Sequence, residues 1–198
     1  MTFLSGSKRL FMKGAVGRLL AALTLILSAC GGIHMIKNDS KPPFAVKPGK
    51  AVLVIMRTAS FYGDTDIKSY LDGKYIGGTK ESSYFMTDVK PGAHYVTADG
   101  GNKDTVRMNF EAGRIYFLQQ GVFPGVFRSL TRYVPMALQD ALHEAQVIDY
   151  IVYDTQHPGD DMSQKDYQAE KKDYEEEVKK DPSHRRDAAQ YKGFNRVK

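Results

Sequence analysis

The sequence predicts a mainly β fold: an antiparallel β-sandwich of about seven to eight strands with one C-terminal amphipathic helix and a charged, partly helical or disordered tail. Three observations predict it. From residue 50 to about 122, apolar or alternating segments are separated by turn residues about every 8–12 positions, the spacing of sandwich strands. Residues 136–148 change to a helical period. Residues 154–198 repeat Lys and Glu and contain almost no aliphatic side chains.

The first strands are marked by an apolar run and by turn chemistry. Residues 51–58 (AVLVIMRT) form an unbroken apolar run up to Met56, which predicts a central strand buried on both faces. Segments 66–71 and 74–77 flank Asp72-Gly73, and both central residues of a type I′ hairpin turn need positive φ. We therefore expect a tight hairpin there. Residues 83–89 form the next strand, which ends before Pro91-Gly92.

Four further strands follow by the same criteria. They are expected at residues 94–98, 105–110, 114–120 and 129–134. The alternation is clearest at Val106, Met108 and Phe110, which we expect to share one buried face. A turn at residues 111–113 joins two of these strands.

The helix is predicted by apolar residues at three- and four-residue steps after Pro135, a residue suited to a first helical turn. The predicted apolar face consists of Met136, Leu138, Ala141, Leu142, Ala145 and Ile148. We expect this face to cover one side or an open edge of the sheet. Residues 147–153 either finish the helix or add a short strand.

The tail, which we place outside the domain, contains one segment with helical features. In residues 163–180, Lys171 precedes Glu175 by four positions, a spacing that supports a helix. Tyr167, Tyr174 and Val178 form a narrow stripe. The segment is either a solvated helix or a helix that docks on a partner or the cell wall.

The N-terminal segment has the layout of a bacterial secretory signal. An apolar run from Leu19 ends in Leu27-Ser28-Ala29-Cys30, basic residues precede it, and Asp39 is the first acidic residue. The run has about eleven apolar or small residues before Cys30, fewer than the roughly 20 that a spanning helix needs.

The end of this run resembles the lipobox of bacterial lipoproteins. The resemblance implies that Cys30 receives a diacylglyceryl group and fatty acids such as palmitate, and that cleavage leaves Cys30 as the first residue. The protein would then be anchored to a lipid bilayer through the Cys30 acyl chains without spanning it. Gly31 is not the Asp that resembles an inner-membrane retention signal, so in a Gram-negative cell we expect the periplasmic face of the outer membrane.

These observations divide the chain into four parts. They are a signal peptide (1–29), the lipidated cysteine with a flexible tether (30–49), a sandwich with its covering helix (50–153) and the charged tail (154–198). The tether is rich in Gly, Pro and Lys and shows no period.

Charge and cysteine content exclude two classes of function. Four of the 28 Lys and Arg residues, and none of the 23 Asp and Glu residues, precede Cys30, so the mature chain has a net charge of about +1. No broad basic surface for nucleic acid is expected. Because Cys30 is the only cysteine, no disulfide or thiolate metal site is expected either.

The turn residues also resemble a known pattern. Segments 70–77 (YLDGKYIG), 84–85 (YF), 89–94 (VKPGAH) and 110–116 (FEAGRIY) look like an uncharacterised bacterial lipoprotein domain, and their order is similar to that of the PEGA repeat. The resemblance covers about residues 50–122. It implies an envelope β domain of unknown function and carries over no catalytic residue.

No catalytic or metal-binding motif stands out. The five histidines are dispersed, and zinc and EF-hand patterns are absent. Asp99, Asp104 and Glu111 lie near turns and are the candidates for paired carboxylates in acid–base chemistry. Solvation of the turns is the simpler explanation for these three carboxylates. No cofactor or metal is expected.

Two apolar loops suggest contact surfaces. Phe61-Tyr62-Gly63 and residues 121–127 carry aromatic rings beside Gly or Pro, so these rings either contact a partner or fold back to cap the sandwich. With the tyrosines of strand 83–89 and of the tail, the predicted contact residues are Phe61, Tyr62, Tyr84, Phe123, Phe127, Tyr167 and Tyr174.

The leading functional hypothesis is a non-enzymatic envelope lipoprotein that acts as a binding or structural module for an envelope protein or the cell wall. One alternative is a glycan or small-ligand module in which Tyr62, Tyr84 and Phe123 stack on sugars. Another is a hydrolase with an unrecognised site.

Overall fold

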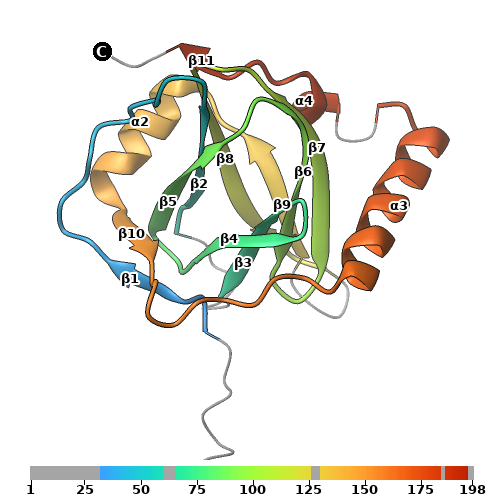
Figure 1. Cartoon of the computed structure of the whole chain (residues 1–198), viewed down its shortest axis with the longest axis horizontal. Coiled ribbons are helices and arrows are strands. Elements are labelled where there is room, and N and C mark those ends of the chain that lie inside the picture. The colour runs from blue at the N-terminus through green and yellow to red at the C-terminus, as the bar shows by residue number, and fades with distance from the viewer. Residues whose placement is uncertain (1–31, 60–65, 126–129, 184–185, 196–198) are drawn as a thin grey trace, which may run out of the picture. The chain divides into compact units, whose positions relative to one another are not determined.

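Two β-sheets make up most of the chain in the computed structural model, which describes residues 32–59, 66–125, 130–183 and 186–195 (Figure 1). In the larger sheet the strand order is β1–β10–β5–β2–β8–β11, and β9 also pairs with β8. Its strands are β1 (Met35–Lys37), β2 (Ala51–Arg57), β5 (Ser83–Val89), β8 (Arg114–Phe123), β9 (Leu130–Pro135), β10 (Asp149–Tyr153) and β11 (Phe194–Asn195). The described residues therefore confirm a mainly β fold.

The smaller sheet is antiparallel, in the order β4–β3–β6–β7. Its strands are β3 (Ile67–Leu71), β4 (Lys74–Thr79), β6 (Gly92–Asp99) and β7 (Lys103–Phe110). The described helices are α2 (Leu138–Val147), α3 (Gln164–Lys180) and α4 (Arg186–Gln190).

Two strand pairs correct the prediction of a purely antiparallel arrangement. β2 pairs with β8 in parallel, and β5 pairs with β10 in parallel. Between β2 and β8 the chain passes through β5 and all four strands of the smaller sheet, and this long connection returns it to the end of the larger sheet at which β2 begins.

Strand β2 is central because both of its faces are buried. Leu53 and Ile55 face a core shared with residues of the smaller sheet such as Val106. Val52 and Val54 face a second core on the other side of the larger sheet. This double burial explains the continuous apolar run in the sequence.

The second core confirms the predicted helix. Ala141 and Ala145 of α2 are buried against the larger sheet, together with Met136 and Ile148. After Ile148 the chain forms β10, so residues 149–153 add a strand and do not continue the helix.

The predicted hairpin turn is confirmed. Asp72 and Gly73, between β3 and β4, have φ angles of 51° and 79°, as a type I′ turn requires. The Asp72 carboxylate also accepts a hydrogen bond from the backbone N–H of Tyr95 on β6 at 3.0 Å. The turn is thereby fixed to the neighbouring strand.

Residues 33–49 do not form the flexible tether that composition predicts. Strand β1 pairs with β10, and the Phe44 ring contacts Phe117 with a centroid distance of 5.1 Å. The Lys41 ammonium donates to three carbonyls at the end of α2, at 2.7–3.0 Å. After β1 the segment runs over the larger sheet as irregular backbone. Its apolar residues are therefore buried although they follow no regular spacing in the sequence.

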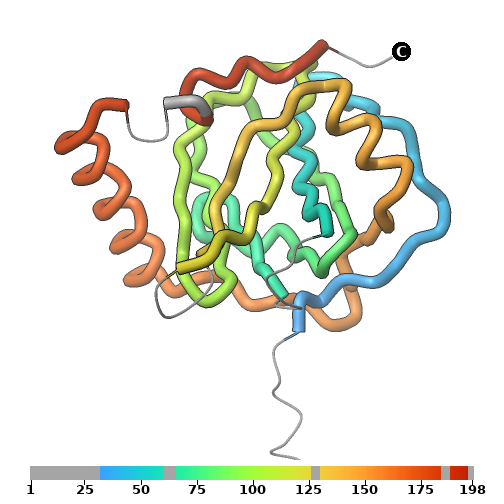
Figure 2. The backbone as a smooth tube through the Cα atoms, turned by 180° about the vertical axis from the view of Figure 1, so that it is seen from behind, coloured from blue at the N-terminus to red at the C-terminus, as the bar shows by residue number. Residues whose placement is uncertain are grey.

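The C-terminal segment does not lie outside the domain, in contrast to the prediction. Helix α3 begins after Ser163, whose hydroxyl accepts from the N–H of Asp166, and Figures 1 and 2 show it alongside β6 and β7. The Tyr174 ring packs edge-on against Tyr95 at 5.8 Å. Ala188 of α4 enters the shared core, and β11 pairs with β8. A narrow aromatic stripe is thus sufficient to dock a highly charged helix.

Candidate functional site

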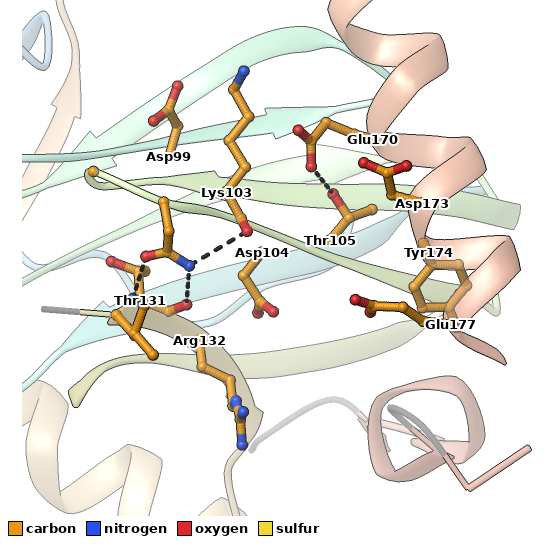
Figure 3. Close-up of a pocket in the computed structure, with 13 residues that line it drawn as sticks. Asp99, Lys103, Asp104, Thr105, Thr131, Arg132, Glu170, Asp173, Tyr174 and Glu177 are labelled. Atoms are coloured by element: carbon orange, nitrogen blue, oxygen red, sulfur yellow. Dashed lines mark hydrogen bonds between the residues drawn. The ribbon is translucent and has the colours of Figure 1, made fainter. Parts of the chain in front are cut away.

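An open groove with a volume of about 640 Å³ lies between α3, the start of β9 and the β6–β7 turn (Figure 3). It is lined by Asp99, Gly101, Asn102, Lys103, Asp104, Thr105, Leu130, Thr131, Arg132, Glu170, Asp173, Tyr174 and Glu177. We call it the α3 groove.

One wall of the groove is a helix face that bears three acidic residues. Glu170, Asp173 and Glu177 are spaced by three and four positions, which places them on one side of α3. Figure 3 shows their side chains directed toward the strands. With two carboxylates from the strand side, the described lining holds five acidic groups and two basic ones, so the groove is negatively charged.

The opposite wall is a turn fixed by hydrogen bonds. The Asn102 side chain accepts from the N–H of Thr131 at 2.6 Å and donates to the Thr131 carbonyl at 3.1 Å. The buried Asp104 carboxylate accepts from the N–H of Tyr133 at 2.8 Å. These bonds hold the β6–β7 turn against β9, so Asn102 and Asp104 have structural roles here.

Glu170 lies in a partly buried environment between α3 and the strands. Burial of the Glu170 carboxyl raises its pKa above the ordinary value, although the Lys103 ammonium acts in the opposite direction. The Thr105 hydroxyl donates to the Glu170 carboxylate at 3.5 Å. This carboxyl therefore takes up a proton more readily than an exposed glutamate does.

The structure brings two of the three predicted carboxylates together. Asp99 and Asp104 both line the α3 groove. Glu111 lies elsewhere and forms an ion pair with Arg114 at 2.7 Å. Sequence reasoning did not find the three acids of α3, although their three- and four-residue spacing marks one helix face.

The predicted contact residues are distributed over several places. Tyr84 is only 2% exposed and packs beneath Phe44 in the second core, so its predicted surface contact is corrected. Tyr174 is also buried, and Tyr167 packs over Gly73. These two residues dock α3 on the protein's own sheet.

Phe123, at the end of β8, is the most exposed of the predicted contact residues that the structure describes, with 43% exposure. The Arg132 guanidinium lies 5.9 Å from its ring centroid. Cys30, Phe61, Tyr62 and Phe127 lie outside the described residues.

No group of three or more His, Cys, Asp or Glu side chains in the described part of the chain has a geometry that would hold a metal ion. No described helix combines the length and apolar character needed to span a membrane.

Comparison with known proteins identifies an uncharacterized relative. No family model matches the chain. A protein of Haemophilus influenzae (strain ATCC 51907 / DSM 11121 / KW20 / Rd), described as uncharacterized, is 30% identical over 127 residues, which cover 61% of this chain and 72% of the relative. The chain belongs to the same family as this Haemophilus protein. The shared family assigns no activity, so the function must be argued from the chain itself.

Proposed function

We propose that this protein is a membrane-anchored envelope lipoprotein whose β domain acts as a non-enzymatic binding or structural module. The observation that carries the proposal is the segment Leu27-Ser28-Ala29-Cys30, which ends a short apolar run and contains the only cysteine of the chain. In this proposal the lipid on Cys30 holds the domain at the outer membrane, where it binds an envelope protein or the cell wall.

The fold is compatible with a rigid platform of this kind. We interpret the two sheets as a β-sandwich related to the PEGA-like lipoprotein domain. Support comes from the hairpin at Asp72-Gly73 and from Gly92, whose φ of 129° begins β6 directly after Pro91. The polar groups of the groove wall are engaged in holding strands together, which suits a binding surface with a fixed shape.

The proposal is tested by replacing the cysteine in the full chain. Cells that express the wild type or Cys30→Ser are fed an alkyne-bearing palmitate, and the protein is recovered from the membrane and soluble fractions. We expect label and membrane retention only in the wild type. Ser28→Ala, which keeps a small residue before the cleavage site, is the matched control and should retain the label. An unlabelled wild-type protein would refute the proposal.

A second candidate function, the binding of a polar ligand with a cationic group, is favoured by the negative charge of the α3 groove. This candidate replaces the predicted stacking of sugars on Tyr84, because that ring is buried. A cell-wall fragment with a free amine is a suitable probe. Glu170→Gln should weaken its binding. Glu176→Gln, on a residue that is exposed and outside the groove, should not.

Equal affinities of the two variants would exclude the groove as the site of binding. The affinities are measured by calorimetric titration of the full chain with the fragment.

A further inference from the structure

The chain becomes part of the fold almost immediately after Cys30. Ile33 is 3% exposed, and its carbonyl accepts a hydrogen bond from the Tyr75 hydroxyl. The carbonyl of His34 accepts from the N–H of Asp154 at 2.9 Å. The backbone is therefore fixed from Ile33 onward, and β1 begins two residues later.

Only Gly31 and Gly32 separate Cys30 from this fixed point. Three residue steps span at most about 11 Å, whatever conformation the two glycines adopt. The polar layer of one leaflet is on the order of 5–7 Å thick. A lipid on Cys30 would consequently hold Ile33 within a few ångströms of the lipid headgroups.

A series of packed residues that runs from Ile33 to Thr131 shows which end of the fold would lie near the lipid. A Cβ placed on Gly78 would lie 2.7 Å from the side chain of Ile33 and 2.9 Å from the carbonyl of Ile67. A Cβ placed on Gly100 would lie 2.8 Å from the Ile67 side chain and 2.7 Å from the Thr131 hydroxyl. Ile33 thus lies at the same end of the fold as the β6–β7 turn and the start of β9. Figures 1 and 2 both show β11 at the opposite end.

This end exposes large apolar side chains. Phe123 and Leu130 are directly paired across β8 and β9, next to Thr131, and are 43% and 39% exposed. Tyr153 is 36% exposed, and its ring lies 5.8 Å from that of Tyr75, which bonds to Ile33. Aromatic rings and arginine are typical of the membrane–water interface, and Arg132 lies over Phe123.

We propose that this end of the fold lies against the lipid bilayer and fixes the orientation of the domain on the membrane. We call it the anchor face, defined by His34, Phe123, Leu130 and Tyr153. The inference rests on the proposed lipid at Cys30. In this arrangement the domain does not move freely on a long tether. It has a fixed orientation, with its β11 end pointing away from the bilayer. Because Leu130 also lines the α3 groove, that groove opens beside the membrane surface.

Charge does not account for the proposed attraction between the anchor face and the bilayer. Asp154 lies next to His34, and it pairs with His157 at 2.9 Å, so this part of the anchor face has no excess of basic groups. The contact is imposed by the short link and by apolar side chains. An uncharged phosphatidylcholine bilayer is therefore the appropriate probe.

The orientation is tested with single fluorescent labels on the full, lipidated chain. Because Cys30 is the only natural cysteine and is capped by lipid, a cysteine introduced elsewhere is the only free thiol. We compare Leu130→Cys with Val134→Cys, two exposed positions on β9 separated by about 13 Å along the strand. Tyr153→Cys and the exposed Val147→Cys, at the end of α2, form a second pair.

The labelled proteins are reconstituted into phosphatidylcholine vesicles that contain a lipid with a nitroxide on its headgroup. We expect at least about twofold stronger quenching at position 130 than at 134, and the same order for 153 against 147, because quenching requires proximity to the headgroup layer. Equal quenching within both pairs, in protein whose mass includes the lipid, would overturn the anchor face alone. A mass without lipid would refute the proposed function as well.

Discussion

Helix α3 should detach from its sheet when Tyr174 is replaced by alanine. Its ring is the one buried side chain of the helix among those described, and it meets Tyr95 edge-on at 5.8 Å. Tyr167 packs over Gly73 near the start of the helix. Two further contacts lie at the surface: the Tyr95 hydroxyl donates to Glu175 at 2.8 Å, and the Lys171 ammonium lies 5.4 Å from the Tyr95 ring centroid. Such exposed pairs contribute little. Tyr174 therefore makes the largest single contribution to the docking energy.

The magnitude follows from the buried area. A buried tyrosine removes on the order of 150 Å² from water, and at about 25 cal/mol per Å² this contributes about 4 kcal/mol. The edge-on ring pair adds about 1 kcal/mol. The methyl group that alanine retains and the side-chain entropy regained offset about 2 kcal/mol. A net loss of about 3 kcal/mol corresponds to a roughly hundredfold increase in the population with α3 detached.

Hydrogen exchange followed by mass spectrometry measures this population directly. In Tyr174→Ala, the amides of α3 should exchange roughly a hundredfold faster, because a helix of 17 residues is marginal in isolation. The amides of β2 should be unchanged. Glu176→Ala is the matched control, because this side chain is exposed and pairs with Lys172 at 3.6 Å on the helix surface. Unchanged exchange of α3 in Tyr174→Ala would refute the reasoning.

Three further predictions concern the core, a helix end and pH. Gln120→Leu should lower the free energy of unfolding by about 1–3 kcal/mol in denaturant titrations, because the buried amide of Gln120 bonds to Ser69 and Tyr133; an unchanged midpoint would contradict this. Lys41→Met should lower stability by about 1 kcal/mol through loss of the α2 carbonyl contacts, whereas an unaltered melting temperature would exclude that role. Burial raises the pKa of Glu170 in the folded chain, so docking of α3 should weaken as pH rises through that pKa and be strongest below the unfolded value of about 4.5. Glu170→Gln should flatten the pH dependence of α3 exchange, and an unchanged slope would show that another group titrates.

Local chemistry explains which elements of the fold were predictable. The hairpin at Asp72-Gly73 depends on two adjacent residues that tolerate positive φ, and β2 depends on burial of both faces. Both signals lie within a few residues. No local pattern shows that β2 and β8 are parallel. A buried strand has the same continuous apolar sequence whether its neighbour is parallel or antiparallel.

The packing of the two segments that flank the sandwich, residues 33–49 and helix α3, was the least predictable part of the fold. Phe44 covers the larger sheet from a stretch without a period, and Lys41 reaches carbonyls more than 100 residues away. The C-terminal helix docks mainly through Tyr174. The many charged residues around Tyr174 make the composition of this segment resemble that of a disordered chain. Composition reports the average of a segment, whereas docking here depends on single side chains.

The candidate groove was predictable only on its turn side. Asp99 and Asp104 flank a turn in the sequence, and the structure places both in the groove. Glu170 comes from a helix more than 60 residues later, and only the tertiary docking of α3 brings it opposite Thr105.

The central claim is the lipid on Cys30, and intact-mass and peptide mass spectrometry of the protein extracted from membranes tests it most directly. We predict a mature chain that begins at Cys30 and carries the mass of a diacylglyceryl group with fatty acids. A chain that retains residues 1–29, or that begins at Cys30 with a free thiol, would contradict the account.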